Sequence, residues 1–227
     1  MRRVLLLLLV LMCGAVYASA GTSQWEFVDW NGGDWTNGYP YYVEPLTDPG
    51  DEIFRVMCDD YAHAGKPGDI WDANVTNLGS RDIALTRFNT SPGPFALFPL
   101  RLYNEAGWIL LQTQTEQNTE WKAMNYAVWR IFDPNAPLFG DAQTWIDAAR
   151  QEAREGFPDI DFNKIYIVTP VNQHDPDPNG IQEFMYIGQD PTGAQQGLAG
   201  GGTTPEPGTL LMVGTGVAAM IGKKVLS

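Results

Sequence analysis

Residues 97–133 read LFPLRLYNEAGWILLQTQTEQNTEWKAMNYAVWRIFD, and their apolar positions recur every three or four residues. Leu100, Tyr103 and Leu111 share one face of a first segment, while Met124 and Val128 share one face of a second. This period is typical of amphipathic helices. The stretch therefore predicts two helices, over residues 99–115 and 119–133, and the proline at position 134 ends the second one.

The flanking sequence changes period on both sides of these helices. A third helix is expected over residues 141–155, where Trp145, Ile146 and Ala149 face inward. Short apolar or alternating stretches between Gly, Pro, Asn and Asp are typical of strands. We expect strands over residues 25–29, 41–46, 52–59, 70–78, 164–169 and 182–187. The near-continuous apolar run at 53–58 indicates a strand buried on both faces.

This order of elements, with strands before and after the helices, predicts an α+β fold. We expect a single domain over residues 21–188, with about three helices grouped on one side of a largely antiparallel sheet. That length is enough for one hydrophobic core.

The first 20 residues have the order of a signal peptide. Arg2 and Arg3 precede an apolar run over residues 4–16, and Ala18 and Ala20 stand where a signal peptidase requires small residues. The run is shorter than the roughly 20 residues that span a bilayer. We therefore expect export through the secretory pathway and cleavage after Ala20.

The last residues carry a second signal, in the order Pro205-Glu206-Pro207, an apolar run over 210–222, and two lysines. This order resembles the PEP-CTERM sorting signal of exported bacterial proteins. The resemblance implies that residues 205–227 are the sorting signal and that the apolar run forms a short transmembrane helix. It also implies that an exosortase is a partner and that the inner membrane holds the chain transiently. A plain membrane anchor is the alternative. Residues 189–204, rich in Gly, Gln and Thr, are expected to be a flexible linker.

The charge balance restricts the partners of the exported domain. The chain has 14 basic and 27 acidic residues, for a net charge of -13. Such a chain repels nucleic acid, because affinity for phosphates comes from cationic contacts. The charge is compatible with calcium, with cationic partners or with solubility outside the cell. Cys58 is the one cysteine left after signal cleavage, so no internal disulfide is expected.

Three short motifs carry a resemblance to bacterial surface thioester domains. They are CDDY at residues 58–61, GDIW at 68–71 and NYAVW at 125–129. In such domains a strand cysteine attacks the amide of a helical glutamine, releases ammonia and leaves an internal thioester. The resemblance implies that Cys58 and Asn125 form the corresponding pair. Asn125 is one methylene shorter than glutamine, which limits the reach that the bond requires. The alternative is a buried structural cysteine packed against a helix.

Residues 175–180, DPDPNG, resemble the first half of a calcium-binding loop. Asp175, Asp177 and Asn179 would supply oxygen ligands at alternate positions. Tyr186 stands where the bidentate glutamate would be, so a solvated turn between two strands is the alternative reading. Apart from calcium, we expect no cofactor.

No pattern of residues predicts an enzyme. The sequence has two histidines, His63 and His174, and no serine in a nucleophile-elbow motif. The predicted function is a structural or adhesive protein of the cell surface or extracellular polymeric matrix, with matrix polysaccharide or a surface protein as partner. A calcium- or carbohydrate-binding module is one alternative. A secreted hydrolase is the other, with paired carboxylates among Asp59, Asp60, Asp72 and Glu105.

Overall fold

The computed structural model describes residues 22–30, 39–46, 52–90, 98–116, 118–172 and 180–189. They all belong to one compact unit, Ser19–Ala194. The predicted signal peptide, most of the predicted linker, the sorting signal and Asp175, Asp177 and Asn179 lie outside the described residues. Within the described part, no helix is both long enough and apolar enough to span a membrane.

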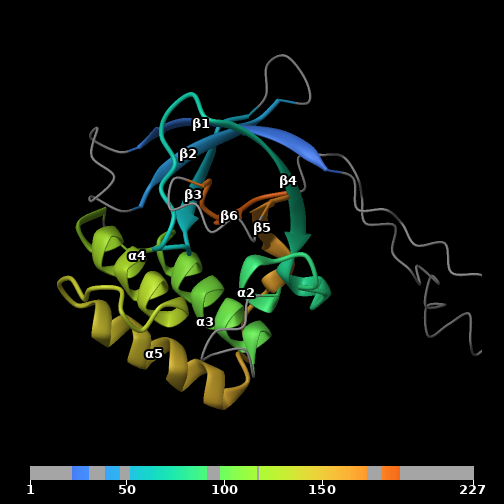
Figure 1. Cartoon of the computed structure of the whole chain (residues 1–227). Helices are drawn as coiled ribbons and strands as arrows, with labels where there is room; N and C mark the ends of the chain where they lie inside the picture. Colours follow the sequence, from blue (N-terminus) through green and yellow to red (C-terminus); the bar gives the residue numbers. More distant parts are fainter. Residues whose placement is uncertain are drawn as a thin grey trace, which may run out of the picture. The chain divides into compact units, whose positions relative to one another are not determined.

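The six strands form a closed antiparallel barrel (Figure 1). They are β1 (Ser23–Trp30), β2 (Tyr41–Pro45), β3 (Phe54–Cys58), β4 (Ile70–Asn77), β5 (Ile165–Pro170) and β6 (Phe184–Ile187). Their order around the barrel is β1-β2-β3-β6-β5-β4. The barrel closes because β4 pairs with β1, where Trp25 of β1 lies opposite Trp71 of β4. An open sheet would leave unpaired backbone groups at its edges, and closure removes them.

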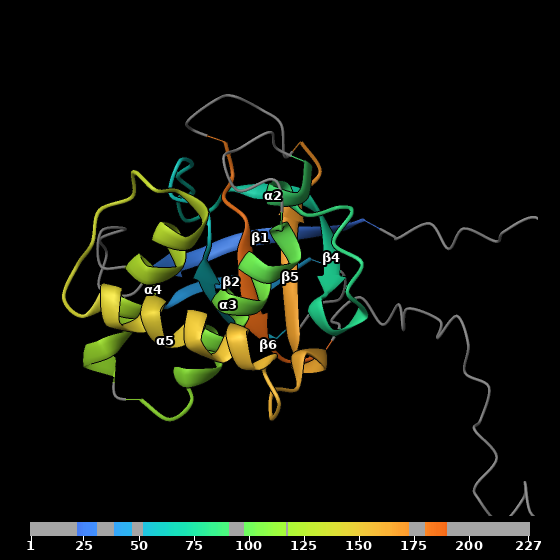
Figure 2. The same cartoon turned by 90° about the horizontal axis from the view of Figure 1, so that it is seen from below.

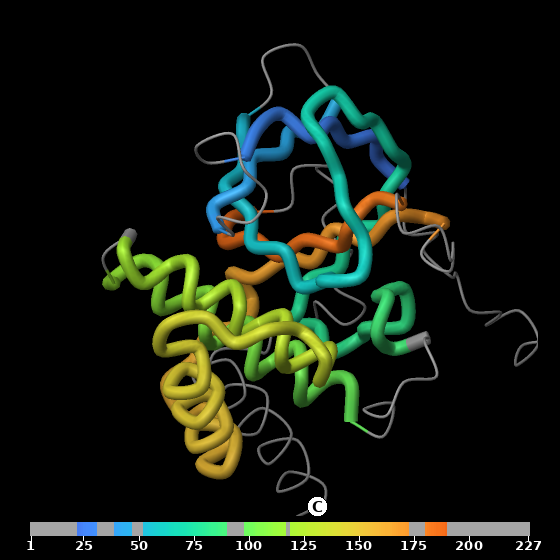
Figure 3. Tube along the Cα trace, turned by 60° about the vertical axis from the view of Figure 1, so that its left-hand side comes forward, coloured from blue at the N-terminus to red at the C-terminus, as the bar shows by residue number. Residues whose placement is uncertain are grey.

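Three long helices lie together on one side of the barrel, as Figures 2 and 3 show. They are α3 (Pro99–Gln112), α4 (Asn118–Phe132) and α5 (Ala142–Glu155). The short elements are α2 (Arg87–Thr90), η3 (Leu78–Ser80) and η4 (Phe162–Lys164). The predicted α+β fold is confirmed, including the grouping of the helices. The closure of the sheet into a barrel was not predicted.

Helix positions follow from the apolar faces that the sequence indicated. In α3 the buried side chains include Tyr103, Ala106 and Ile109, which are spaced by three. Gly107 also faces the barrel, where a Cβ atom would come within 2.9 Å of side chains of Ile165 and Leu78. The missing side chain therefore lets α3 pack closely against the strands. Elsewhere α3 contacts β6, and α4 contacts β3.

The described residues form two hydrophobic cores that meet at α4. One lies between the helices and the barrel wall and includes Met124 and Val128. The other fills the barrel and includes Trp25, Phe184 and Trp129. Trp129 comes from α4, so this helix reaches into the barrel core.

Strand β3 differs in part from the expectation that both its faces are buried. Val56, Met57 and Cys58 are buried, but Arg55 is exposed and the preceding Ile53 is 51% exposed. The reason is that Ile53 and Arg55 border an open cleft, and Arg55 contacts α4 only by lying over the Trp121 ring.

Candidate functional site

Cys58 is the last residue of β3 and is fully buried. Its Sγ donates to the carbonyl oxygen of Asp60 at 3.2 Å and accepts from the Asp60 amide at 3.4 Å. Burial raises the pKa of the Cys58 thiol well above its ordinary value, and the negative charge of Asp60 raises it further. The thiol is therefore protonated at neutral pH and is a poor nucleophile.

Asn125 lies on α4 directly beside Cys58, although 67 positions separate the two residues in the chain. The Asn125 side-chain nitrogen donates to the backbone carbonyl oxygen of Cys58 at 3.2 Å. Among the described residues, the Asn125 side-chain oxygen has no hydrogen-bond partner, and the residue is fully buried. The structure thus brings together the two residues that the thioester resemblance paired. Their contact in the structure is a hydrogen bond between a side chain and the backbone.

Next to this pair lies a buried polar cluster that the sequence analysis missed. Its centre is Glu183, which precedes β6 and is fully buried. Glu183 accepts from the Tyr103 hydroxyl at 2.5 Å, from the Thr169 hydroxyl, and from the Arg87 backbone amide at 2.8 Å. These three donors come from α3, β5 and the start of α2, so the cluster links the helices to the barrel.

Asp59 faces Glu183 and is also fully buried. Burial raises the pKa of Asp59 well above its ordinary value, and the charge of Glu183 adds to the rise. Burial also raises the pKa of Glu183, but its hydrogen bonds from Thr169 and Tyr103 oppose that rise. Because both pKa values are raised, the two carboxyls together hold one proton. Glu183 accepts three hydrogen bonds, whereas neither oxygen of Asp59 accepts one from the described residues, so this proton belongs on Asp59. Asp59 can then donate to Glu183.

Arg87 supplies the positive charge of this cluster. Its guanidinium donates to the Asp60 carboxylate and, at 2.8 Å, to the carbonyl oxygen of Ile181. His63 lies on the same carboxylate, with 2.8 Å between its Nδ1 and the Asp60 Oδ2. Arg87 and Asp60 are almost completely buried, whereas His63 is partly exposed and borders a cleft of about 470 Å³.

The carboxylates proposed for a hydrolase do not share a cleft. Asp59 and Asp60 are buried, and Glu105 is buried with its Oε1 at 2.8 Å from Arg101. Asp72 is exposed on β4. The carboxyls that do converge, Asp59 and Glu183, are fully enclosed. A substrate cannot reach them without local opening of the fold.

The described residues contain no group of three or more His, Cys, Asp or Glu side chains that could hold a metal ion. The calcium loop predicted at Asp175, Asp177 and Asn179 lies outside them, so it stays a prediction. Among the described residues, no tryptophan is strongly exposed, so the tryptophans serve mainly as core residues.

Comparison with known proteins gave one structural likeness. The chain matches no protein-family model and no curated protein. It is similar in structure to the N-terminal thioester domain of a surface protein from Clostridium perfringens, with 14% identity and a TM-score of 0.42. The match covers 73% of this chain and 98% of that domain.

Proposed function

We propose that this chain is an exported protein of the cell surface or the extracellular matrix, with a structural or adhesive role and no catalytic activity. The patterns at both ends support export, namely the signal-peptide order up to Ala20 and the Pro205-Glu206-Pro207 tail. In this proposal an exosortase processes the tail, and the inner membrane holds the chain only until that step.

We further propose that its adhesion is non-covalent. The observation that carries this part is the contact between Cys58 and Asn125. A thioester requires a thiolate that reaches the carbon of the side-chain amide and expels ammonia. In this protein burial keeps the thiol protonated and its Sγ binds the backbone of Asp60, while the Asn125 amide nitrogen binds the backbone carbonyl of Cys58.

The neighbouring acidic residues give the physical reason why the thiol is unreactive. Asp59 and Asp60 follow Cys58 directly, and both are buried. The negative charge of Asp60 disfavours the thiolate, and burial disfavours it more strongly because the charged form loses its hydration. The same environment that stabilises the junction of barrel and helices therefore suppresses nucleophilic chemistry at Cys58.

Labelling of intact cells tests this function. Antibodies against the folded domain are applied to intact cells of the producing bacterium, and surface-labelled protein is then extracted by boiling in detergent without reductant. We expect surface labelling and complete extraction of the wild type, and the same result for Cys58→Ala. No labelling before cell lysis would refute the location. A labelled fraction that resists extraction in the wild type but not in Cys58→Ala would refute non-covalent adhesion.

A further inference from the structure

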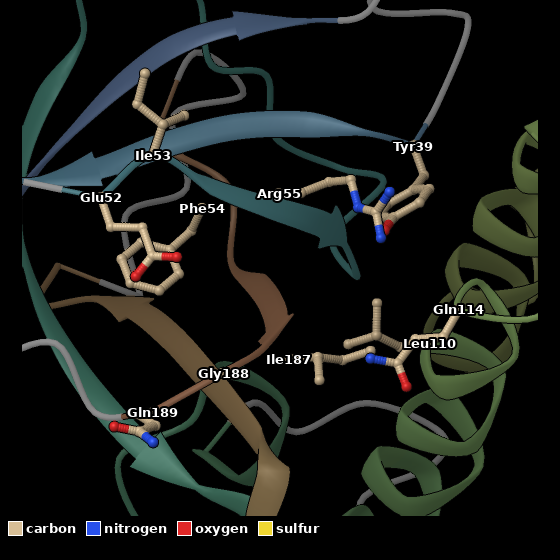
Figure 4. Close-up of a pocket in the computed structure, with 10 residues that line it drawn as sticks. All are labelled: Tyr39, Glu52, Ile53, Phe54, Arg55, Leu110, Gln114, Ile187, Gly188 and Gln189. Atoms are coloured by element: carbon tan, nitrogen blue, oxygen red, sulfur yellow. The ribbon is translucent and has the colours of Figure 1, made fainter.

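The first half of β3 borders a cleft of about 670 Å³ between the barrel and α3 (Figure 4). This volume lies within the range of pockets that bind small molecules, about 300–1,000 Å³. Its polar side chains include Arg55, Gln114, Glu52 and Gln189. The cleft is separate from the buried cluster around Cys58 and shares no lining residue with it.

Arg55 is held in place at the end of the cleft near α3. Its guanidinium carbon lies 4.9 Å from the centre of the Trp121 ring and 5.5 Å from that of Tyr39. The two rings meet edge to face at 5.2 Å, and the Tyr39 hydroxyl is 3.3 Å from the Thr113 hydroxyl. Stacking on aromatic rings fixes the plane of a guanidinium, so less freedom is lost when it binds a ligand.

Arg55 has no ion-pair partner within the described part of the chain, whereas Arg87 and Arg101 each have one. A guanidinium presents paired N–H groups that match the two oxygens of a carboxylate. Gln114, from the turn after α3, adds an amide at the same end of the cleft. This end is therefore suited to a carboxylate.

The other end of the cleft has different chemistry. Figure 4 shows Glu52 and Gln189 on the side away from α3. Glu52 carries only acceptors when it is ionised, and it is exposed, so it suits the hydroxyl donors of a ligand. Phe54 and Ile187, which are half-buried, add apolar surface to the lining between the two ends.

We propose that this cleft binds a uronic acid residue of a carboxylate-bearing polysaccharide. The carboxylate of the sugar pairs with Arg55, its hydroxyls bind Glu52 and the glutamine amides, and its C–H face contacts the apolar side chains. An acidic peptide would also bring a carboxylate to Arg55. However, it lacks the row of hydroxyl donors, and a second acidic side chain would be repelled by Glu52.

The net charge of -13 sets a condition on the ligand. A polymer with a charge on every sugar is repelled by the protein as a whole, so the proposal favours a polymer in which uronic acids alternate with neutral sugars. At physiological salt the Debye length is about 8 Å, which limits the repulsion to nearby charges.

Titration calorimetry of the full chain at physiological salt and in the presence of EDTA tests the proposal. The probe is a hyaluronan tetrasaccharide, in which uronic acids alternate with neutral sugars, and fully N-acetylated chitotetraose is the neutral comparison. We expect the hyaluronan tetrasaccharide to bind and chitotetraose to bind at least tenfold more weakly, since it lacks a carboxylate for Arg55. Arg55→Gln should weaken binding of the hyaluronan tetrasaccharide by roughly 10- to 100-fold, because it removes a charge-assisted pair.

Lys122→Gln is the matched control. Lys122 also stacks on aromatic rings, with its Nζ 4.4 Å from the centre of the Phe139 ring, but it does not line the cleft. The Lys122→Gln substitution should leave the affinity for the hyaluronan tetrasaccharide unchanged. If Arg55→Gln lowers the melting temperature, Gln114→Ala replaces it as the test variant, because Gln114 is exposed.

Four results would overturn the proposal. They are no binding of the hyaluronan tetrasaccharide at millimolar concentration, equal binding of chitotetraose, equal affinity for a hexaglutamate peptide, or full affinity in a folded Arg55→Gln variant. The proposal names a ligand for the surface protein and rests on the proposed function only for its biological setting. Failure to bind in calorimetry would leave the result of cell labelling unaffected.

Discussion

Replacing Arg87 with methionine tests the buried cluster that joins the barrel to the helices. Arg87 neutralises Asp60, and its side chain is 5% exposed. Its backbone amide also binds Glu183, and that contact survives the substitution. Methionine keeps much of the apolar length of the side chain, so the change removes mainly the charge and its hydrogen bonds.

The expected loss of stability follows from the buried carboxylate left behind. Removing one partner of a buried ion pair typically costs about 3–5 kcal/mol. A domain of this size has a free energy of unfolding of about 5–15 kcal/mol, so the variant should remain folded but be much less stable. At about 2–4 °C per kcal/mol, the melting temperature should fall by roughly 10 °C.

The loss should depend on pH. Burial raises the pKa of Asp59 and of Glu183, and the Arg87 charge opposes this rise. Without Arg87 the folded protein binds protons more tightly, so part of the lost stability returns in acid. We therefore expect a larger destabilisation at about pH 8 than at about pH 5.

Urea unfolding followed by tryptophan fluorescence at both pH values measures the effect. Lys164→Met is the control, because Lys164 and Asp161 are 65% and 50% exposed and their charged atoms are 3.9 Å apart. Such a surface pair should contribute less than about 1 kcal/mol. If Arg87→Met lost no more stability than this control at about pH 8, the proposed role of the buried charge would be wrong.

Two other substitutions probe the same junction. The folded protein retains a proton on the pair Asp59 and Glu183, whereas the unfolded chain releases it above about pH 4. The free energy of unfolding of the wild type should therefore fall as pH rises from about 4 towards the raised pKa of Asp59. Asp59→Asn mimics the protonated acid and should flatten this decline in urea titrations across pH, whereas an unchanged slope would place the proton elsewhere. Asn125→Ala removes the donor to the Cys58 carbonyl and should cost about 1–3 kcal/mol by thermal unfolding. The exposed control Asn135→Ala should change stability by less than about 0.5 kcal/mol, and equal losses in both variants would contradict this role.

The helices and strands were predictable because their signals are local. The apolar periods placed the three long helices within about three residues of their observed ends, and the six strands agree to a similar degree. The closure of the barrel was not predictable in the same way. It depends on the pairing of β1 with β4 and of β3 with β6, and these partners are far apart in the chain. Strand patterns fix which face is buried but not which strand lies alongside.

The candidate site was only partly visible in the sequence. The motifs around Cys58 and Asn125 predicted a pair that the structure does bring together, and its chemical role stays a prediction. Arg87, Glu183 and Tyr103 were missed, because local sequence does not show that a polar side chain is buried. The one available signal was the position of Glu183, directly before the apolar strand β6.

The most direct test of the account is the intact mass of the exported protein, purified without reducing agent, before and after methylamine treatment. We predict the mass calculated for the processed chain, residues 21–204, no methylamine uptake, and alkylation of Cys58 only after unfolding, because the thiol is buried and protonated. A mass about 17 Da lower, from loss of ammonia, together with methylamine uptake that Cys58→Ala abolishes, would contradict the account and show an internal thioester.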